Sequence, residues 1–150
     1  MSAASFEVAS SPPLPLPDGL TRFFWEGVEK ERLMILRCRD CGHFVHYPRP
    51  ICNRCQSTTL SPEQVSGRGT LYSYSVVLQA FHPYFVDKIP YVLAVVELAE
   101  EPGLRLTTNM VDTPESELAV GMPVEVTFVK VTDRLVLPMF RPSTGKDPLQ

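Results

Sequence analysis

The second half of the chain consists of short stretches in which apolar and polar residues alternate, separated by turn residues. Alternation with a period of two predicts half-buried β-strands. Five strands are predicted in this way, at residues 70–79, 91–98, 104–111, 124–131 and 134–140. Residues 100–103 and 121–123 carry turn sequences, and residues 113–118 predict one short helix with Thr113 as its N-cap.

Five strands with a short helix between the third and the fourth follow the order of a five-stranded Greek-key barrel, the OB-fold. We therefore predict a mainly β protein with an OB-fold barrel over residues 67–142. In its first strand we expect strict alternation. One face would carry Leu71, Ser73, Ser75 and Val77, and the other Tyr72, Tyr74, Val76 and Leu78.

The first half of the chain carries a different pattern. Residues 18–32 combine Asp18 or Thr21 as an N-cap with apolar residues on one helical face, and so predict an N-terminal helix. Gly27 weakens its middle, which leaves two short helical turns as an alternative. The apolar run 33–36 predicts a strand, and the polar residues 61–69 predict a joint before the barrel.

Fifteen of the 150 residues are proline, which argues against a bundle of long helices. Four of these prolines fall in residues 1–17, which predict a flexible proline-rich arm. A leader that docks on the protein's own body is favoured over a polyproline ligand for another domain. The predicted division is an arm (1–17), a helix with a cysteine-rich module (18–66), the barrel (67–142) and a C-terminal tail (143–150).

The arm lacks the cationic start and the apolar block of a secretory signal. No apolar run approaches the ~20 residues of a membrane span, so no membrane contact is expected. These features predict a cytoplasmic protein, in which cysteines bind metal more often than they form structural disulfides.

All four cysteines lie in two CxxC motifs separated by ten residues: Cys38, Cys41, Cys52 and Cys55. Each motif presents two thiolates from one tight turn, and two such turns complete the tetrahedron that Zn²⁺ prefers. Two disulfides or a redox pair are the less economical alternatives. Four thiolates leave no open position for water, so the predicted zinc is structural. His43 and His46 lie nearby, where surface or supporting roles are favoured over ligation.

The net charge of −3 argues against a protein whose main function is to bind nucleic-acid phosphates. Residues 32–55 nevertheless carry five arginines and one aspartate. This patch suits a phosphate-bearing ligand or an acidic partner, although a solvated face is the plainer interpretation. Because basic residues near the barrel aromatics are few, nucleic acid is an unlikely partner.

The connection 80–90 between the first two predicted strands is rich in aromatics. It predicts either an apolar contact surface or a loop that folds onto its own barrel. A nucleophile elbow, a P-loop and a dinucleotide fingerprint are all missing from the sequence, so no catalytic role is expected. The residues expected to contact a ligand or a partner are Trp25, Arg37, Arg49, Phe81, His82, Tyr84 and Phe85.

Several segments together resemble one known family. These are Phe24-Trp25-Glu26-Gly27, the two cysteine motifs with Tyr47-Pro48-Arg49-Pro50 between them, Gly67-Arg68-Gly69-Thr70-Leu71, Thr108-Asn109-Met110-Val111, Gly121-Met122-Pro123 and Leu137-Pro138-Met139-Phe140-Arg141-Pro142. Over about residues 18–142 the chain resembles the acyl-CoA-associated zinc-ribbon OB-fold proteins, a domain family of unknown function whose ribbon is rubredoxin-like.

The resemblance implies a non-catalytic partner of thiolase-like enzymes, including thiolase-type aldolases of steroid or fatty acyl side-chain degradation, and of MaoC-type hydratases. It also implies help in binding or channelling acyl-CoA, with a CoA thioester as the bound ligand. A stand-alone module that binds acyl-CoA or single-stranded nucleic acid is the alternative function, and a small hydrolase is a third.

Overall fold

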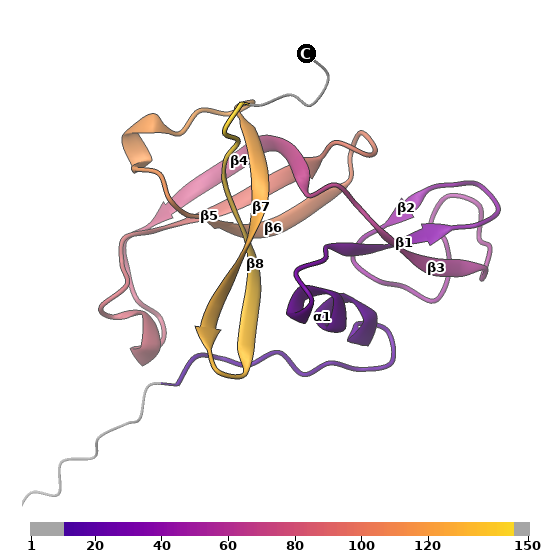
Figure 1. Cartoon of the computed structure of the whole chain (residues 1–150), viewed down its shortest axis with the longest axis horizontal. Coiled ribbons are helices and arrows are strands. Elements are labelled where there is room, and N and C mark those ends of the chain that lie inside the picture. The colour runs from indigo at the N-terminus through magenta and orange to yellow at the C-terminus, as the bar shows by residue number, and fades with distance from the viewer. Residues whose placement is uncertain (1–10, 146–150) are drawn as a thin grey trace, which may run out of the picture.

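The computed structural model describes residues 11–145, which form a small three-stranded sheet beside a closed five-stranded barrel (Figure 1). The elements in chain order are α1 (Arg22–Glu29), β1 (Met34–Cys38), β2 (Phe44–Val45), β3 (Leu60–Gln64), β4 (Arg68–Val77), η1 (Pro83–Phe85), β5 (Tyr91–Leu98), β6 (Arg105–Met110), η2 (Glu115–Glu117), β7 (Pro123–Thr132) and β8 (Leu135–Pro142). The prediction of a mainly β protein with one N-terminal helix, a ribbon and an OB-fold barrel is confirmed.

The barrel closes in the order β4-β5-β6-β8-β7, with β4 pairing back onto β7 through Arg68–Thr70. Its neighbours are antiparallel except for β6 and β8, which run parallel and share the single register pair Met110 and Phe140. The β6–β8 seam therefore has the fewest register pairs in the barrel. The helix expected at residues 113–118 is one 3-10 turn, η2, whose N-cap is Pro114 and not Thr113.

Strict alternation along β4 is wrong, because the register shifts between Leu71 and Ser73. A β-bulge puts one extra residue into the strand and so exchanges its two faces. Leu71 is fully buried before the bulge, whereas Tyr74 and Val76 pack on the core after it. Tyr72, at the bulge, stays outside and lies under the guanidinium of Arg105, 3.7 Å from its ring centroid.

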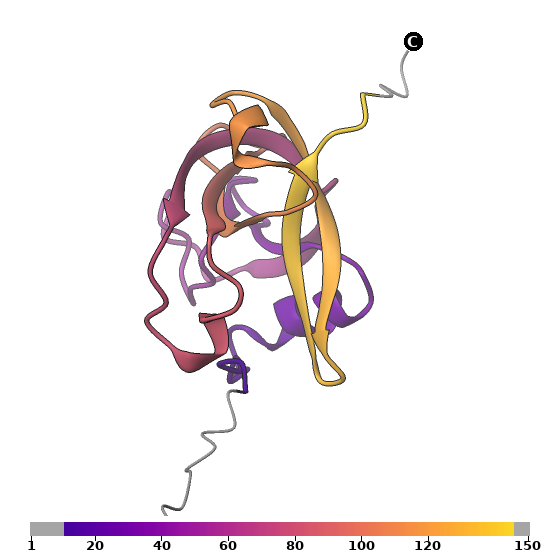
Figure 2. The ribbon, with the colours of Figure 1, turned by 90° about the vertical axis from the view of Figure 1, so that its left-hand side faces the viewer.

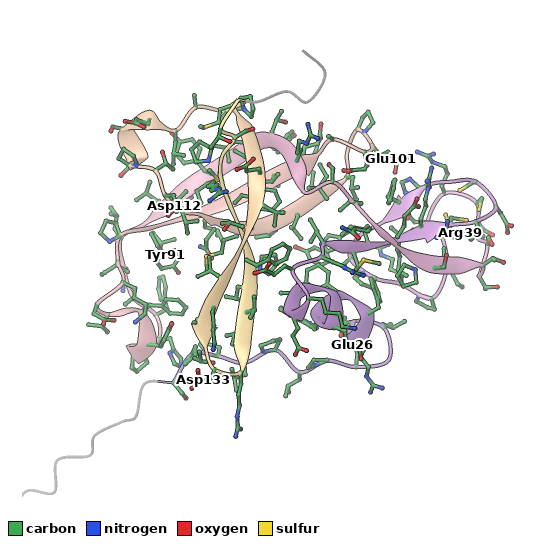
Figure 3. All side chains as sticks on the ribbon, viewed as in Figure 1. Glu26, Arg39, Tyr91, Glu101, Asp112 and Asp133 are labelled. Atoms are coloured by element: carbon green, nitrogen blue, oxygen red, sulfur yellow. The ribbon has the colours of Figure 1, made fainter. Side chains whose placement is uncertain are left out.

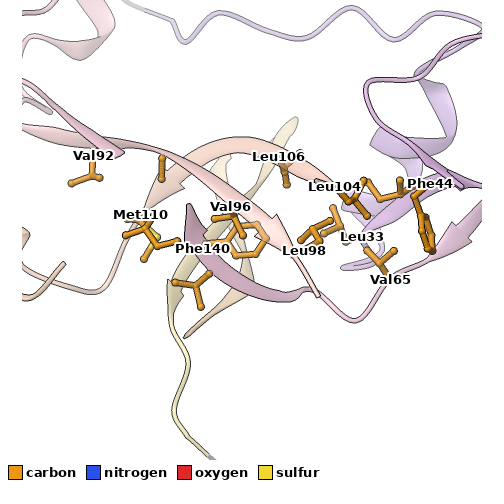
Figure 4. Packing of buried hydrophobic residues seen from close by; sticks show 14 of the residues in the cluster. Leu33, Phe44, Val65, Val92, Val96, Leu98, Leu104, Leu106, Met110 and Phe140 are labelled. Atoms are coloured by element: carbon orange, nitrogen blue, oxygen red, sulfur yellow. The ribbon is translucent and has the colours of Figure 1, made fainter. Parts of the chain in front are cut away.

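One hydrophobic core serves both modules (Figure 4). Its barrel side includes Leu98, Leu104 and Phe140, and its ribbon side includes Leu33 and Phe44. A smaller cluster inside the ribbon contains Leu36, Val45 and two of the cysteines. β1 serves both clusters, because its alternate side chains point to opposite faces.

Helix α1 covers the junction between the ribbon and the barrel (Figures 1 and 2). It is one helix of eight residues, shorter than the 18–32 predicted, with Thr21 at its N-cap position. Asp18 instead closes the preceding turn, accepting hydrogen bonds from Leu20 and Thr21. Gly27 allows close packing there, because a Cβ would lie 2.6 Å from Cγ of Met34.

The polar joint predicted at 61–69 is wrong for its first half, because Leu60–Gln64 forms β3. β3 pairs antiparallel with β1 along its whole length and forms an edge of the ribbon sheet. An edge strand needs few apolar residues and tolerates proline, which explains why the polar sequence Ser-Pro-Glu-Gln concealed it.

Residues 11–17 run along the lower end of the barrel, past the tip of the β7–β8 hairpin and toward α1 (Figure 1). Pro12 and Pro13 line a hollow together with Tyr84 and Phe85, so this part of the arm contacts the protein's own body. The predicted flexibility of residues 1–10, and the end of the tail from 146 to 150, lie outside the described residues. Among residues 11–145, none of the helices has the length and hydrophobicity needed to cross a bilayer.

Candidate functional site

The two cysteine motifs face one another at the far end of the ribbon, around the β1–β2 turn and the loop after β2. The four Sγ atoms all lie within 4.8 Å of one another, with Cys38 to Cys55 at 3.6 Å and Cys41 to Cys52 at 3.7 Å. A tetrahedron of sulfurs about 2.3 Å from a central Zn²⁺ has edges of about 3.8 Å. The spacing of the thiols therefore fits a tetrahedral thiolate-bound metal.

Backbone amides prepare the site for anionic sulfur. Hydrogen bonds from the amide groups of Cys41 and Asp40 lower the pKa of Cys38 to about 6. The pKa of Cys52 is lowered in the same way by the amides of Cys55 and Arg54.

Cys55 shows why the site needs a cation. Its thiolate is favoured by the Ser57 amide, but the neighbouring thiols of Cys41, Cys38 and Cys52, together with burial, raise its pKa to about 12. Four adjacent thiols cannot all ionise unless a cation balances their charge.

One carboxylate joins the cysteine-bearing ribbon to the barrel (Figure 3). Glu101, in the turn between β5 and β6, accepts hydrogen bonds from His43 Nδ1 at 2.9 Å, the Phe44 amide at 2.8 Å and the Arg54 guanidinium at 2.9 Å. Burial alone would raise the pKa of Glu101, but these donors and charges hold it below its usual value. Glu101 therefore remains ionised and clamps both cysteine loops to the barrel.

The two histidines near the cysteines have different surroundings, and their supporting roles stay a prediction. His43 is held by Glu101. His46 packs against Phe24 and Tyr47, and burial lowers its pKa to about 4, so it is neutral at pH 7. Its Nε2 atom is buried without a hydrogen-bond partner in residues 11–145.

The ribbon arginines are mostly neutralised within the structure. Arg37 donates to the Gly42 carbonyl and to Glu63, and Arg39 also pairs with Glu63. Arg49 forms no ion pair among the described residues and lines a polar hollow with His43, His46 and Asn53. Arg32 is likewise without an ion pair in residues 11–145, so three of the five arginines of residues 32–55 are paired with carboxylates.

The connection between β4 and β5 packs partly on the barrel and is partly exposed. Phe85 packs edge-on to Tyr84 and lies 5.4 Å from the ring of Tyr91, so this part folds onto the barrel. His82 accepts a hydrogen bond from the Tyr84 amide at the start of η1. Phe81 remains 85% exposed, and its use as a contact surface stays a prediction.

The sequence-predicted contact residues fall into three places. Trp25 lines a cavity at the ribbon–barrel junction, Arg37 and Arg49 lie on the ribbon, and the other four lie in the β4–β5 connection, at the end of the barrel away from the ribbon (Figure 1). Two of these four, Tyr84 and Phe85, line a second cavity that shares Asn109, Leu137 and Met139 with the first. Sequence reasoning missed Glu101, because its sequence context is that of an ordinary carboxylate in a turn. It also missed that His46 lines the cavity at the ribbon–barrel junction. No local pattern marks either residue, because both act through contacts between modules.

The fold and the cysteine site define a class of protein, a zinc ribbon fused to an OB-fold barrel. Residues 25–61 match the rubredoxin-like zinc ribbon domain of ChsH2, and residues 62–129 match the C-terminal OB-fold domain of ChsH2. The chain belongs to this ChsH2/DUF35 family.

Its relatives fall into two groups. A DUF35 domain-containing scaffold protein of Methanocaldococcus jannaschii is 35% identical over 73% of this chain and 77% of its own length. A probable enoyl-CoA hydratase alpha subunit of Thermomonospora curvata is 36% identical over 90% of this chain. The chain spans only 41% of that hydratase subunit.

Two solved structures share the fold. A chain of the Ltp2-ChsH2(DUF35) aldolase superposes with a TM-score of 0.78 and 37% identity, covering 86% of this chain and 98% of that chain. A DUF35 protein of unknown function from Sulfolobus solfataricus has a TM-score of 0.56 at 13% identity, covering 81% of this chain and 84% of that chain, and so supports the fold alone.

Proposed function

We propose that this protein is a non-catalytic accessory subunit that binds a thiolase-type aldolase and helps to bind or channel its acyl-CoA thioester. The similarity to the Ltp2-ChsH2(DUF35) aldolase chain, which extends over 98% of that chain, carries the proposal. A Mycobacterium tuberculosis relative, the 3-oxo-4,17-pregnadiene-20-carboxyl-CoA hydratase alpha subunit, is 35% identical over 75% of this chain and 35% of its own length. Steroid or fatty acyl side-chain degradation is therefore the proposed context, and a MaoC-type hydratase is a second possible partner.

The metal in this proposal is a structural Zn²⁺ held by Cys38, Cys41, Cys52 and Cys55. Zinc neutralises the thiolates and fixes the two cysteine loops, and a site with four sulfur ligands has no position left for substrate. A reducing compartment such as the cytoplasm keeps these thiols available to the metal.

The proposed enzyme contact is the loop between β4 and β5. Leu78, Phe81 and Val86 are 74%, 85% and 66% exposed, although they are large and apolar. Grouped apolar exposure of this kind is typical of a surface that another protein covers. His82, Tyr84 and Phe85 shape the same loop and belong to the proposed contact.

The proposed contact for the CoA phosphates is Arg49. Its guanidinium is unpaired among the described residues, and the hollow beside it is lined by polar groups. The proposed contribution of Arg37 to holding the CoA phosphates is indirect, because its guanidinium is already bonded to Glu63 and stacked on the ring of Phe44.

Co-elution of the full chain with the thiolase-like enzyme encoded beside it tests the proposal. We expect a stable complex on size exclusion, and we expect Val86→Asp to weaken it at least tenfold. Val120→Asp is the matched control, because Val120 is 68% exposed in a different connection, between β6 and β7. Failure of the wild-type chain to co-elute or to alter the enzyme's activity would refute the accessory role, and turnover of acyl-CoA by the isolated chain would favour a hydrolase.

A further inference from the structure

A groove runs along the weakly paired seam between β6 and β8. Its first part, about 250 Å³, lies where α1, the ribbon and the barrel meet, and is lined by Trp25, His46 and Pro138 among others. Its second part, about 300 Å³, lies beside Phe85 and Tyr91. Asn109, Leu137 and Met139 line both parts. The two hollows are therefore neighbours along one barrel face.

The barrel topology places the groove at a seam with little backbone pairing. β6 and β8 share the register pair Met110 and Phe140, and they are also joined by the Val111 amide, which donates to the Phe140 carbonyl, and by the Thr108 hydroxyl, which donates to the Pro138 carbonyl. The ribbon and α1 then cover one end of the opening, and residues 12–13 of the arm cover the other. The arm, the ribbon with its helix, and the barrel thus all contribute walls to the groove.

The chemistry of the walls selects a neutral occupant. None of the residues lining the first part carries a charge at pH 7, since His46 is neutral there. In the second part Lys88 is the charged residue, and its ammonium lies 3.0 Å from Asp87 and over the ring of Tyr84. Burying a charged ligand group against such walls would cost several kcal/mol in desolvation.

His46 and Asn109 are two of the polar side chains in this largely apolar lining. The Nε2 atom of His46 is buried and finds no hydrogen-bond partner between residues 11 and 145, a condition that costs stability until a partner is supplied. The Asn109 amide nitrogen donates to the Val92 carbonyl at 3.0 Å, which leaves its oxygen free to accept. The groove therefore recognises an apolar body that carries one or two hydrogen-bonding groups.

We propose that this groove binds a neutral, largely apolar group with one carbonyl oxygen, and that His46 donates a hydrogen bond to that oxygen. An apolar cavity of about 150 Å³ accommodates benzene, so the two parts together have room for an extended chain or fused rings. Identifying this group as the acyl part of a thioester rests on the proposed function. The site itself rests only on the groove and its walls.

Trp25 provides a direct signal for binding, because it is the single tryptophan and lines the first part. The full chain is titrated with the dodecanoyl thioester of N-acetylcysteamine, a neutral probe without the CoA nucleotide, while Trp25 fluorescence is recorded. We expect a saturable change. We expect His46→Phe to weaken binding about tenfold, and His46→Gln, which keeps a donor, to weaken it less than threefold.

A second pair of variants tests the groove without touching His46. Thr107→Phe narrows the first part from β6, whereas Thr70→Phe places the same ring on the exposed face of β4. We expect the first to weaken binding at least fivefold and the second to leave it unchanged. The proposal is overturned if the probe gives no saturable signal, if His46→Phe and His46→Gln bind equally, or if Thr107→Phe binds like the wild type.

These outcomes are separate from those of the proposed function. A chain that co-elutes with its enzyme but does not bind the probe would overturn the groove assignment and leave the accessory role intact. A chain that binds the probe but never associates with an enzyme would overturn the accessory role and leave the groove assignment intact.

Discussion

His46 makes the stability of the protein depend on pH in a direction that can be calculated. Burial lowers its pKa from 6.5 to about 4, so between these values the unfolded chain binds a proton that the folded protein does not. Stability therefore falls as the pH falls through this window, and the loss is complete below about pH 4. Between pH 7 and pH 5, linkage gives a loss of about 2 kcal/mol from this one residue.

Urea unfolding at pH 7 and at pH 5, with saturating zinc, measures this loss. His46→Gln has no titrating group at the site, so we expect its stability to fall by about 2 kcal/mol less than that of the wild type between the two pH values. Loss of metal at lower pH affects both proteins and cancels in the comparison. His82→Gln, at an exposed histidine, is the control and should retain the wild-type loss.

Equal losses in the wild type and in His46→Gln would refute the reasoning. That result would mean that His46 reaches water in the folded protein, and the apolar character of the groove beside it would have to be abandoned as well.

Three further perturbations test the junction, the barrel and the metal site. Glu101→Gln should cost about 1–3 kcal/mol in urea unfolding and speed hydrogen exchange at the Phe44 amide, because one carboxamide cannot accept from three donors; unchanged exchange would contradict the clamp. Gly69→Ala should cost at least about 2 kcal/mol, since its Cβ would meet the Glu97 carbonyl oxygen, whereas Gly19→Ala, with nothing within 4 Å, should stay within about 0.5 kcal/mol; similar thermal shifts would refute this contrast. Cys52→Ser should reduce zinc by elemental analysis from one ion per chain to a small fraction, and full occupancy would remove Cys52 from the ligand set.

Local patterns predicted the barrel because each strand alternates and each turn carries its own residues. β5 matches its predicted range, Tyr91–Leu98, to the residue, since both of its ends are marked by turn residues. The β4 bulge was missed because a bulge changes no residue type, only the register against β5. β3 was missed because an edge strand needs few apolar residues to form.

The cysteine site was predictable because it is also built from local patterns. Each CxxC motif forms one tight turn, and the sequence shows both motifs and the ten residues between them. The groove was not predictable, because its walls come from six separate segments that meet only in the folded protein. His46 is five residues from Cys41 and looks like part of the ribbon. Its ring packs against Phe24 of the helix, and it lines the same cavity as Trp25.

The metal site and the groove are physically connected although they do not touch. Glu101 binds the backbone of Phe44 and the side chain of His43. These residues lie two and three positions before the groove residue His46. Phe44 is also part of the core shared with the barrel. A metal ion that fixes the loop before β2 therefore also fixes the wall of the groove. Loss of zinc should consequently weaken binding of a neutral probe even though no cysteine lines the groove, and a metal-free chain that keeps full probe affinity would break this connection.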